Sequence, residues 1–496
     1  MLMSFLRGFR NRRATSAAAI FSHASSRCTL SALFVASLIS APTALALTLP
    51  SATLNTALQT NKINREALSA VAIPLNGAGK SVYMNADTLI NPASTMKLVT
   101  TYAALELLGP SFQWKTEFFI DGSLKDGVLN GNLYLKGGGD PKLNMERLWL
   151  LLRDLRAHGV RHVSGNLVLD RNFFLPPPHK PFNDDGNDNT KPFLVEPDSL
   201  LVNFKAQRFI SRAEPSGIKI VMEPPIGGIE IINNVKMQNA KNCSTSVVNF
   251  TENDDGNTLT LTASGTMAPG CSTQSYLAYL DHPRYAAGLV RSIWQEMGGT
   301  ILGNDVHGRT PANARLLVRS YSPDLAEVVR DINKYSNNTM AKQVFLTIGA
   351  QFRTPADSND AVAARRVINS LFARNKIPTN GFFIENGSGL SRQERITARQ
   401  LGMMLEAAWK SPYAAEFISS MPLVGMDGTM RRRLKNTPLA GNAHIKTGTL
   451  RNVRAVAGYS RDLQGKTWAV VAIVNHSQPW GGAQVIDQVL LDVYKQ

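Results

Sequence analysis

The chain has 496 residues, too many for one hydrophobic core, and a length of this order favours two to four domains. Apolar residues make up 44% of the chain and charged residues 18%, which excludes an intrinsically disordered protein. The formal net charge is +16. This excess favours anionic surroundings such as cell-wall polymer, lipid head groups or nucleic acid, without choosing among them.

Residues 1–46 have the pattern of an export signal. The basic stretch RGFRNRR precedes the apolar run LSALFVASLISAPTALA, which ends in the small-x-small pattern ALA at 44–46. The pair RR at 12–13 is a weak twin-arginine signal, because the apolar residues usual after the pair are missing, so the export route stays open. A retained membrane anchor is the alternative, although the apolar run is short and is broken by Ser and Pro.

The first predicted elements are of mixed character. Residues 47–109 combine a short helix at LPSATLNTALQTN, a strand pair around VAIPLNGAGKSVYMN and a helix over NPASTMKLVTTYAALELLG. From residue 113, apolar–polar alternation with DG and NG turns predicts an antiparallel sheet that ends at GGGDP. A helix at LNMERLWLLLRDLRAHG, a strand at NLVLDRNFF and a long exposed loop at LPPPHKPFNDDGNDNTKPF follow.

The middle of the chain is richer in strands than its two ends. Residues 200–310 contain strand-like segments such as GIKIVMEPP, IEIINNVK and NTLTLTASGTM. Helices resume from about 320, at PDLAEVVRDINKYSNNTMAKQVFLTIGA and TARQLGMMLEAAWK. The hairpin VRAVAGYS-RDLQGK-TWAVVAIVNH and a short amphipathic helix end the chain. This order predicts an α+β fold in which a β-rich region is inserted into one discontinuous domain.

Two of the three cysteines lie in the predicted mature chain. Cys28 would leave with the export signal, and Cys243 and Cys271 fit a disulfide in an oxidising compartment. Two buried free thiols are the alternative. Neither cysteine has a His or Cys at zinc-ligand spacing nearby, and we predict no metal and no cofactor.

Three short segments carry the candidate chemistry. In chain order they are Ser94-Thr95-Met96-Lys97, Ser336-Asn337-Asn338 and Lys446-Thr447-Gly448-Thr449. Residues three apart on a helix share a face, so Ser94 Oγ and Lys97 Nζ can meet. A serine hydroxyl is a poor nucleophile until a neighbour accepts its proton, and a desolvated lysine near other cations can be that neighbour. An ordinary helix start is the alternative, because Pro92 and Ser94 also suit that position.

The second and third segments supply binding groups. The Ser336 hydroxyl and the Asn338 amide suit proton relay and the anchoring of a peptide amide. A Lys-Thr-Gly strand can line the edge of a cleft, where Lys446 and Thr447 bind a carboxylate. Each segment alone is weak evidence, because a polar helix turn or a β-turn accounts for it equally well. Together, in this order in an exported protein, they match the penicillin-binding proteins and β-lactamases.

The sequence resembles the low-molecular-mass class C penicillin-binding proteins, the D-alanyl-D-alanine carboxypeptidase/endopeptidases of the penicillin-binding protein 4 type. The similar stretches also include LYLKGGGDPKL, NGSGLSR (386–392), MPLVGMDGTMRRRL (421–434) and HIKTGTLRNVRAVAGYS (444–460), so the similarity covers nearly the whole mature chain. The resemblance implies a periplasmic serine peptidase that acts on peptidoglycan stem peptides and binds β-lactams covalently. Peripheral membrane association is compatible with the charge. Nucleic acid is disfavoured, because no Lys/Arg-rich run is longer than RRRLK.

The spacing of the segments indicates extra domains. Ser94 and Ser336 are 242 residues apart, far more than a minimal β-lactamase-like domain requires. In the family, this excess forms two added β-rich domains, one nested in the other. We therefore expect a penicillin-recognising domain of antiparallel sheet and helices. The expected ranges are a signal peptide at 1–46, the penicillin-recognising domain at 47–112 and 320–496, an inserted domain at 113–139 and 232–319, and a nested domain at 140–231.

The resemblance also implies roles for individual residues. Ser94 becomes the acylated nucleophile and Lys97 its base, while Ser336 relays a proton to the leaving D-alanine and Asn338 holds the peptide amide. Lys446 and Thr447 bind the terminal carboxylate. Gly448 lets the strand approach closely, and the N–H groups of Ser94 and Thr449 form the oxyanion hole.

Two further residues are assigned to a substrate pocket by the resemblance. Arg392 in SGLSR corresponds to a residue near the pocket for the diaminopimelate side chain, and Asp184 in FNDD corresponds to the acid that shares it. Phe182 stands where a Trp is expected, so a solvated acidic loop is the alternative for Asp184.

Two other functions are weighed against a peptidase. A class A β-lactamase needs a Glu-x-x-Leu-Asn loop after the second segment, whereas the nearest similar stretch, EPDSLLVN, begins at Glu196, before that segment, and has the wrong spacing. Its absence predicts slow deacylation of β-lactams. A non-catalytic envelope scaffold that retains the fold is the second alternative, but a scaffold does not require all three segments.

Overall fold

The computed structural model describes residues 48–496 except 78, 179–181, 183–189 and 241. The predicted export signal at 1–46 and the predicted pocket residue Asp184 lie outside the described residues. Among the described residues, no helix has the length and apolar character that crossing a bilayer requires.

The main sheet combines strands from both ends of the chain. Its order is β18-β19-β20-β1-β2, and every neighbouring pair is antiparallel. The sheet brings the third candidate segment, on β18, into the same layer as the N-terminal strands. Its strands are β1 (Leu68–Pro74), β2 (Val82–Met84), β18 (Ala443–Leu450), β19 (Val453–Arg461) and β20 (Thr467–Asn475).

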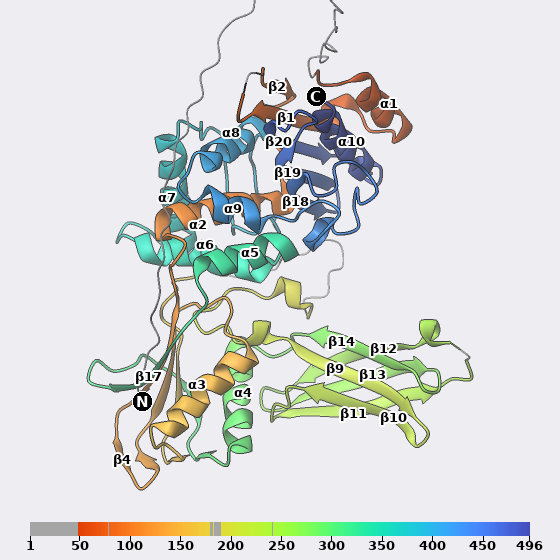
Figure 1. Cartoon of the computed structure of the whole chain (residues 1–496). Coiled ribbons are helices and arrows are strands. Elements are labelled where there is room, and N and C mark those ends of the chain that lie inside the picture. The colour runs from red at the N-terminus through yellow and green to blue at the C-terminus, as the bar shows by residue number, and fades with distance from the viewer. Residues whose placement is uncertain (1–47, 78, 179–181, 183–189, 241) are drawn as a thin grey trace, which may run out of the picture. The chain divides into compact units, whose positions relative to one another are not determined.

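Two helical layers bury the two faces of this sheet (Figure 1). Successive side chains of a strand point to opposite faces, so Val471 joins one core and Val470 the other. Because helices cover both faces of the sheet, nearly all residues of β20 are apolar, as in the run WAVVAIV. The helices are α2 (Met96–Leu108), α5 (Leu325–Tyr335), α6 (Asn338–Phe352), α7 (Asp360–Arg374), α8 (Ala398–Trp409) and α9 (Ala414–Ser420) against one core, and α1 (Ala52–Thr60) and α10 (Gly482–Tyr494) against the other.

Helix α2 is the central helix of the larger core. All residues from Met96 to Leu105 are buried, so the helix is enclosed by protein on every side. Such a helix has no polar face and shows little amphipathic periodicity. A short 3₁₀ turn, Ala93–Thr95, leads directly into it.

Residues 115–170 and 282–321 form two mixed sheets and two long helices. The sequence predicts only antiparallel pairs here, and β3–β6 and β4–β5 are antiparallel. The strands beyond the predicted range, β7 and β8, pair in parallel with β5 and β6, because α3 crosses over between the paired strands. The elements are β3 (Lys115–Ile120), β4 (Ser123–Lys125), β5 (Val128–Asn130), β6 (Leu133–Gly137), α3 (Met145–Ala157), β7 (His162–Val163), β8 (Leu167–Asp170), α4 (His282–Glu296), β15 (Thr300–Ile301), β16 (Asp305–His307) and β17 (Arg315–Tyr321).

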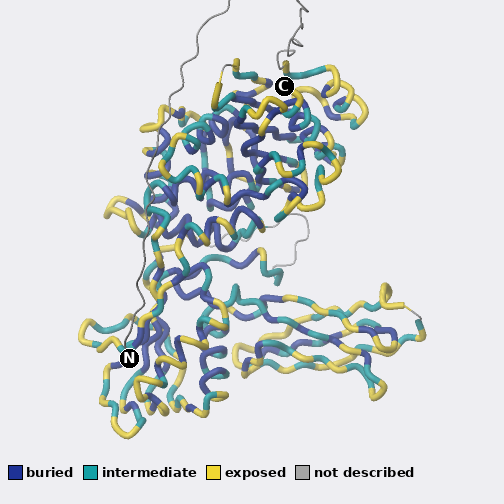
Figure 2. The backbone as a smooth tube through the Cα atoms, in the orientation of Figure 1, coloured by how far each residue is buried: buried dark blue, intermediate teal, exposed yellow. Residues whose placement is uncertain are grey.

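Two three-stranded sheets occupy residues 207–277. Their orders are β10-β9-β14 and β11-β13-β12, and Phe209 of one contacts Phe250 of the other with ring centroids 4.8 Å apart. Figure 2 shows that intermediate and exposed residues predominate in these strands, unlike in the main sheet. The strands are β9 (Gln207–Glu214), β10 (Gly217–Glu223), β11 (Ile229–Met237), β12 (Val247–Asp254), β13 (Leu259–Met267) and β14 (Ser272–Leu277).

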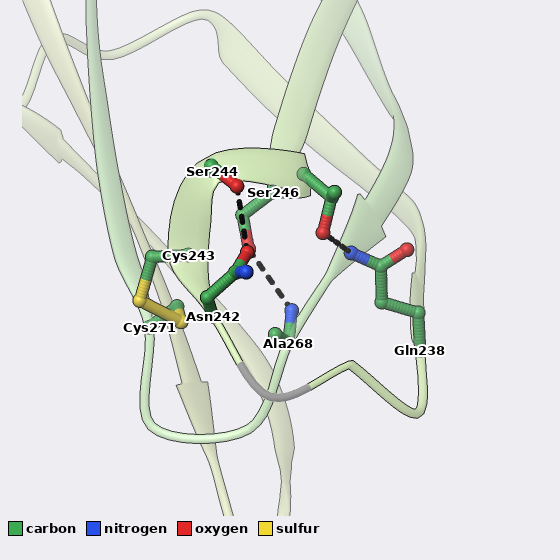
Figure 3. Close-up of a disulfide and its surroundings, with 8 residues drawn as sticks. Gln238, Asn242, Cys243, Ser244, Ser246, Ala268 and Cys271 are labelled. Atoms are coloured by element: carbon green, nitrogen blue, oxygen red, sulfur yellow. Dashed lines mark hydrogen bonds between the residues drawn. A yellow bond between two sulfur atoms is a disulfide. The ribbon is translucent and has the colours of Figure 1, made fainter.

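A disulfide joins Cys243 and Cys271 at one end of these sheets (Figure 3). The bond links the segment before β12 to the segment before β14, across 28 residues of chain. Beside it, Ser246 Oγ accepts a hydrogen bond from Ala268 N at 3.0 Å. The two connecting segments are therefore fixed to each other by both a covalent and a polar contact.

Candidate active site

Ser94 lies in the 3₁₀ turn that precedes α2. Asn91 holds this turn, because its side chain accepts a hydrogen bond from Ala93 N at 2.9 Å and donates to Ser391 O at 2.8 Å. Asn475, at the end of β20, donates to Asn91 O at 3.1 Å. Ala93 itself has φ = +47°, a conformation that costs energy for a residue with a side chain. The turn that carries Ser94 is thus strained and is held by buried hydrogen bonds.

Two glycines allow other segments to approach this turn closely. A Cβ atom at Gly389 would lie 1.9 Å from Ala93 O, and a Cβ atom at Gly448 would lie 3.0 Å from Ser94 N. The separation at Gly389 is shorter than a side chain tolerates, and a Cβ atom at Gly448 would also lie only 2.8 Å from Pro92 O. The absence of a side chain at Gly448 therefore lets β18 lie directly against the backbone of Ser94, in agreement with the role expected for this glycine.

Lys97 Nζ lies at the centre of the site. The side chain is fully buried, and Nζ lies 3.0 Å from Ser94 Oγ, 2.6 Å from Asn338 Oδ1 and 2.5 Å from Ser388 O. Burial, together with the positive charges of Lys446 and Lys342, holds the pKa of Lys97 well below its ordinary value. A neutral amine at hydrogen-bond distance from a serine hydroxyl can accept the hydroxyl proton.

The second segment forms the junction between α5 and α6. Ser336 ends α5 in a left-handed conformation, and the Asn337 side chain caps α6 by accepting a hydrogen bond from Met340 N at 2.9 Å. This tight junction directs the Asn338 carbonyl oxygen to Lys97 and its amide nitrogen to Phe193 O, 3.2 Å away.

The third segment lies on β18, the edge strand of the main sheet. Lys446 is fully buried, and its Nζ donates to Ser336 Oγ at 2.8 Å and to Thr447 O at 2.6 Å. Burial lowers the pKa of Lys446 to about 7. Thr447 Oγ1 lies 2.9 Å from Thr429 Oγ1. The structure therefore brings all three candidate segments together around Ser94.

Among the residues that the structure describes, backbone hydrogen bonds cover only the first half of the β18 edge. Ala443 O and the N–H of Ile445 bond to residues 422–424, at 2.9 and 2.8 Å. Backbone groups alternate along a strand, so Thr447 and Thr449 also direct their N–H groups away from β19. From Lys446 onward, no backbone hydrogen bond from the described residues reaches this edge, so a peptide strand can add to it, and the N–H of Thr449 points out of it.

The turn 385–391 was not assigned to the catalytic centre by the sequence, although its Ser388 carbonyl binds Lys97. On the same turn, Gly387 O accepts a hydrogen bond from Thr100 Oγ1 at 2.7 Å, which attaches the turn to α2. The glycine–serine alternation of NGSGLS indicates a tight turn. No pattern in the neighbouring sequence indicates that this turn contacts Lys97. Asn91 and Thr429 were missed for the same reason.

Arg392 follows this turn directly. Its side chain is exposed, and Nη1 donates to Asn452 Oδ1 at 2.7 Å, in the connection between β18 and β19. The expected partner Asp184 lies outside the described residues, so the pocket that the two residues are predicted to share stays a prediction. No cluster of three or more His, Cys, Asp or Glu suited to a metal occurs in the described part of the chain.

A segment of the inserted region is bound along α6. Thr339 Oγ1 donates to Val195 O at 3.1 Å, and Lys342 Nζ pairs with Glu196 Oε1 at 2.7 Å. One turn further on, Gln343 Oε1 accepts a hydrogen bond from Asp198 N at 2.8 Å. The helix that presents Asn338 therefore also anchors residues 193–198.

Comparison with known proteins identifies the family. The model of the D-Ala-D-Ala carboxypeptidase 3 (S13) family matches residues 50–491. The chain belongs to this family. The D-alanyl-D-alanine carboxypeptidase DacB of Haemophilus influenzae is 25% identical over 408 residues, which cover 79% of this chain and 81% of that protein. The D-alanyl-D-alanine carboxypeptidase of Actinomadura sp. is 28% identical over 437 residues, 83% of this chain and 79% of that protein.

A solved structure shares the fold of this S13 chain. The crystal structure of penicillin binding protein 4 from Haemophilus influenzae superposes with a TM-score of 0.75 at 22% sequence identity, covering 90% of this chain and 100% of that chain. The same protein is also known in complex with a β-lactam. The prediction of a low-molecular-mass class C penicillin-binding protein with an α+β fold is confirmed, and so is the prediction of a serine-type D-Ala-D-Ala carboxypeptidase.

Proposed function

We propose that this S13 enzyme removes the C-terminal D-alanine from peptidoglycan stem peptides through an acyl-enzyme on Ser94. The observation that carries the proposal is the contact of 3.0 Å between Ser94 Oγ and the buried Nζ of Lys97. The lowered pKa of Lys97 supports its role as the base, because only the neutral amine can accept a proton.

Acylation uses all three segments. Lys97 accepts the hydroxyl proton, and Ser94 Oγ attacks the carbonyl carbon of the D-Ala–D-Ala bond. The negative charge that develops on the carbonyl oxygen is stabilised by the N–H groups of Ser94 and Thr449. As the tetrahedral intermediate collapses, the carbon–nitrogen bond breaks, and the proton held by Lys97 reaches the leaving amine through the Ser336 hydroxyl, which leaves Lys97 neutral again. Free D-alanine departs, and the shortened peptide remains as an ester on Ser94.

Deacylation uses the same groups in a second cycle. Water loses a proton to Lys97 and attacks the ester carbonyl, with the oxyanion again at the N–H groups of Ser94 and Thr449. The carbon–oxygen bond then breaks, and the proton returns to Ser94 Oγ. The products are the free enzyme and a peptide that is one residue shorter.

The substrate is held at the open part of the β18 edge. Lys446 and Thr447 bind the terminal carboxylate, and a carboxylate beside Lys446 favours the charged amine over the neutral one. Asn338 binds the peptide amide, and the peptide adds to β18 as a short strand.

Product analysis tests this function. Purified enzyme is incubated with a stem pentapeptide and with a cross-linked peptide dimer, and the products are identified by liquid chromatography and mass spectrometry. Loss of one alanine from the pentapeptide shows carboxypeptidase activity, and conversion of the dimer to monomers shows endopeptidase activity. If neither substrate changes while the protein is folded, the proposed function is wrong.

We propose that β-lactams acylate the same Ser94 and are released slowly. The class A deacylating Glu-x-x-Leu-Asn loop has no counterpart after the second segment of the sequence. Glu196, the nearest candidate, pairs with Lys342. Slow release of the bound β-lactam favours a peptidase over a β-lactamase. The hydrogen bonds that join the three segments around Ser94 favour an enzyme over a non-catalytic scaffold.

Replacing Arg392 tests the predicted pocket for the diaminopimelate side chain. We expect Arg392→Ala to lose the preference for stem peptides whose diaminopimelate carries a free carboxylate, because a guanidinium binds a carboxylate by charge-assisted hydrogen bonds. The ratio of kcat/KM for a diaminopimelate peptide and the matching lysine peptide measures this preference. Arg315→Ala, a change at an exposed arginine on β17, is the control. An unchanged ratio in Arg392→Ala removes this residue from the pocket.

Replacing Thr429 tests the support of the carboxylate site. Thr429 Oγ1 bonds the hydroxyl of Thr447, so Thr429→Val should raise KM for D-Ala-D-Ala peptides and leave kcat nearly unchanged. The bond is exposed, and its loss corresponds to about 0.5–1 kcal/mol, or roughly two- to fivefold in KM. Steady-state kinetics measure the effect, with the surface change Thr56→Val on α1 as the control. A fall in kcat at constant KM would contradict this role.

We propose that the enzyme is exported and acts in the periplasm, in peripheral contact with anionic envelope components. The export-signal pattern at 1–46, the net charge of +16 and the disulfide between Cys243 and Cys271 support this location. The N-terminal mass of protein isolated from the cell envelope tests it, since signal cleavage after residue 46 leaves Leu47 as the first residue.

We also propose a discontinuous domain organisation with a revised inner boundary. The penicillin-recognising domain keeps the expected ranges 47–112 and 320–496. Strand pairing supports a nested domain at about 207–277, since the strands of this range pair with one another in the described part of the chain. Residues 140–170, expected in the nested domain, contribute β7 and β8, which pair with strands at 128–137 and 300–307.

A further inference from the structure

Glu394 is a buried carboxylate that the mechanism above does not use. Its side chain is fully buried. The carboxylate accepts hydrogen bonds from the backbone N–H groups of Glu385 at 3.0 Å and of Asn386 at 3.4 Å. A carboxylate costs energy to bury, so its position behind the catalytic centre requires compensating contacts. The two N–H groups supply them, and both belong to the turn 385–391.

This turn connects Glu394 to the catalytic lysine. Asn386 Oδ1 accepts hydrogen bonds from Ser388 N and Ser388 Oγ, at 3.0 and 2.7 Å, and Asn386 Nδ2 donates to Leu390 O at 3.0 Å. The turn is therefore braced internally, and Ser388 O lies 2.5 Å from Lys97 Nζ. A displacement of Asn386 would move the carbonyl that holds Lys97.

Glu394 and Lys97 also interact electrostatically. Lys97 faces three charged groups: Lys446 on β18 and Lys342 on α6 disfavour its protonated form, whereas Glu394 favours it. Glu394 itself faces Glu385, which disfavours its ionised form, and Arg365 on α7, which favours it. Burial raises the pKa of Glu394 to about 7. Above this pKa Glu394 is ionised, and its negative charge counteracts the positive charges of Lys446 and Lys342 at Lys97.

We propose that Glu394 is a positioning residue of the active site, which fixes the turn 385–391 against Lys97 and supplies the negative charge that offsets Lys446 and Lys342. It does not touch the reacting atoms and acts through Lys97. The inference rests on the proposed role of Lys97 as the base in the acylation of Ser94.

The charge has a defined effect on the dependence of acylation on pH. Acylation requires neutral Lys97, so its rate rises as pH passes through the pKa of this lysine. Removing the negative charge of Glu394 lowers that pKa further. The acid limb of the pH–rate profile in Glu394→Gln should therefore lie at lower pH than in the wild type, by about half a unit or more. Glu394→Asp keeps the charge and should retain the wild-type position of the limb, although its shorter side chain lowers the rate.

The experiment measures the second-order rate constant for acylation by a fluorescent penicillin between about pH 5.5 and pH 9.5. This range extends to both sides of the raised pKa of Glu394, about 7. Full-length wild type, Glu394→Gln and Glu394→Asp are compared. Glu406→Gln removes a carboxylate that pairs with Lys410 on α8, and serves as the charge-matched control. Thermal unfolding monitors the fold of every variant.

The results separate the possible roles. The proposal is supported if the acid limb of the pH–rate profile lies at lower pH in Glu394→Gln and keeps its wild-type position in Glu394→Asp and Glu406→Gln. Coincident limbs in wild type and Glu394→Gln overturn it, and so does an equal loss of rate at every pH in both Glu394 variants, which is the result of a purely structural role. Failure of the proposed function gives a different result, because the wild type itself then takes no label.

Discussion

Ser94→Ala is expected to form no covalent adduct with a fluorescent penicillin and to release no D-alanine above background. The change removes the only atom of this residue that attacks a carbonyl in the proposed mechanism, so the acyl-enzyme cannot form. The fold should survive, because Ser94 Oγ bonds Lys97 Nζ and does not cap α2, whose N-cap is Thr95. Gel fluorescence after denaturation measures the adduct, and D-alanine is measured enzymatically.

The control for this prediction is Ser370→Ala. Ser370 lies on α7, and its exposed hydroxyl bonds Arg366 O within the same helix. This variant should label as fast as the wild type. A labelled Ser94→Ala protein would show that another residue is the nucleophile, and the proposed mechanism would be wrong.

Lys97→Met is expected to slow acylation by about 10²- to 10⁴-fold, the usual contribution of a general base. Methionine is similar in length and apolar, so it can occupy the buried space of Lys97 without a charge. The residual acylation rate should no longer rise with pH through the pKa of Lys97. Stopped-flow acylation by a chromogenic β-lactam across pH measures both effects.

Lys410→Met is the control for Lys97→Met. Lys410 is exposed and pairs with Glu406 at 2.6 Å on α8, so its replacement should leave the rate and the pH profile unchanged. If Lys97→Met keeps a wild-type rate near neutral pH, Lys97 is not the base. The thermal unfolding temperature separates this result from a loss of folded protein.

The sequence predicted the parts of the site that depend on local periodicity. Residues three apart at a helix start share a face, and Ser94 Oγ and Lys97 Nζ lie 3.0 Å apart. Lys446 and Thr447 belong to a segment that was expected to form a strand at the edge of a cleft, and both lie on β18. The order of the three segments, together with the family resemblance, predicted that they meet.

The rest of the site depends on contacts between distant segments, which periodicity does not encode. Ser388 binds Lys97 from 291 residues further along the chain, through a backbone carbonyl that every residue type possesses. Thr429 and Asn91 likewise act through partners that no local pattern specifies. Glu394 was not singled out, because nothing in SRQER distinguishes a fully buried glutamate from a solvated one.

The same reason limits the prediction of the fold. Alternation indicates that a segment is a strand, but not which strand lies beside it or in which direction. The parallel pairs β5–β7 and β6–β8 were therefore not predicted. The expected inner boundary at 140 divides β6 from β8, although these two strands are neighbours in one sheet.

The burial of the first ten residues of α2 has a consequence for the motions of the site. Backbone amides in a helix that is enclosed by protein exchange their hydrogens with solvent chiefly when the whole domain unfolds, whereas amides of exposed segments exchange through local opening. The ten residues from Met96 to Leu105 are all buried, and this helix carries Lys97 one turn from the nucleophile. Ser94 and Lys97 are thus attached to a helix whose backbone amides are expected to exchange slowly. Their alignment persists in the resting enzyme between one substrate and the next.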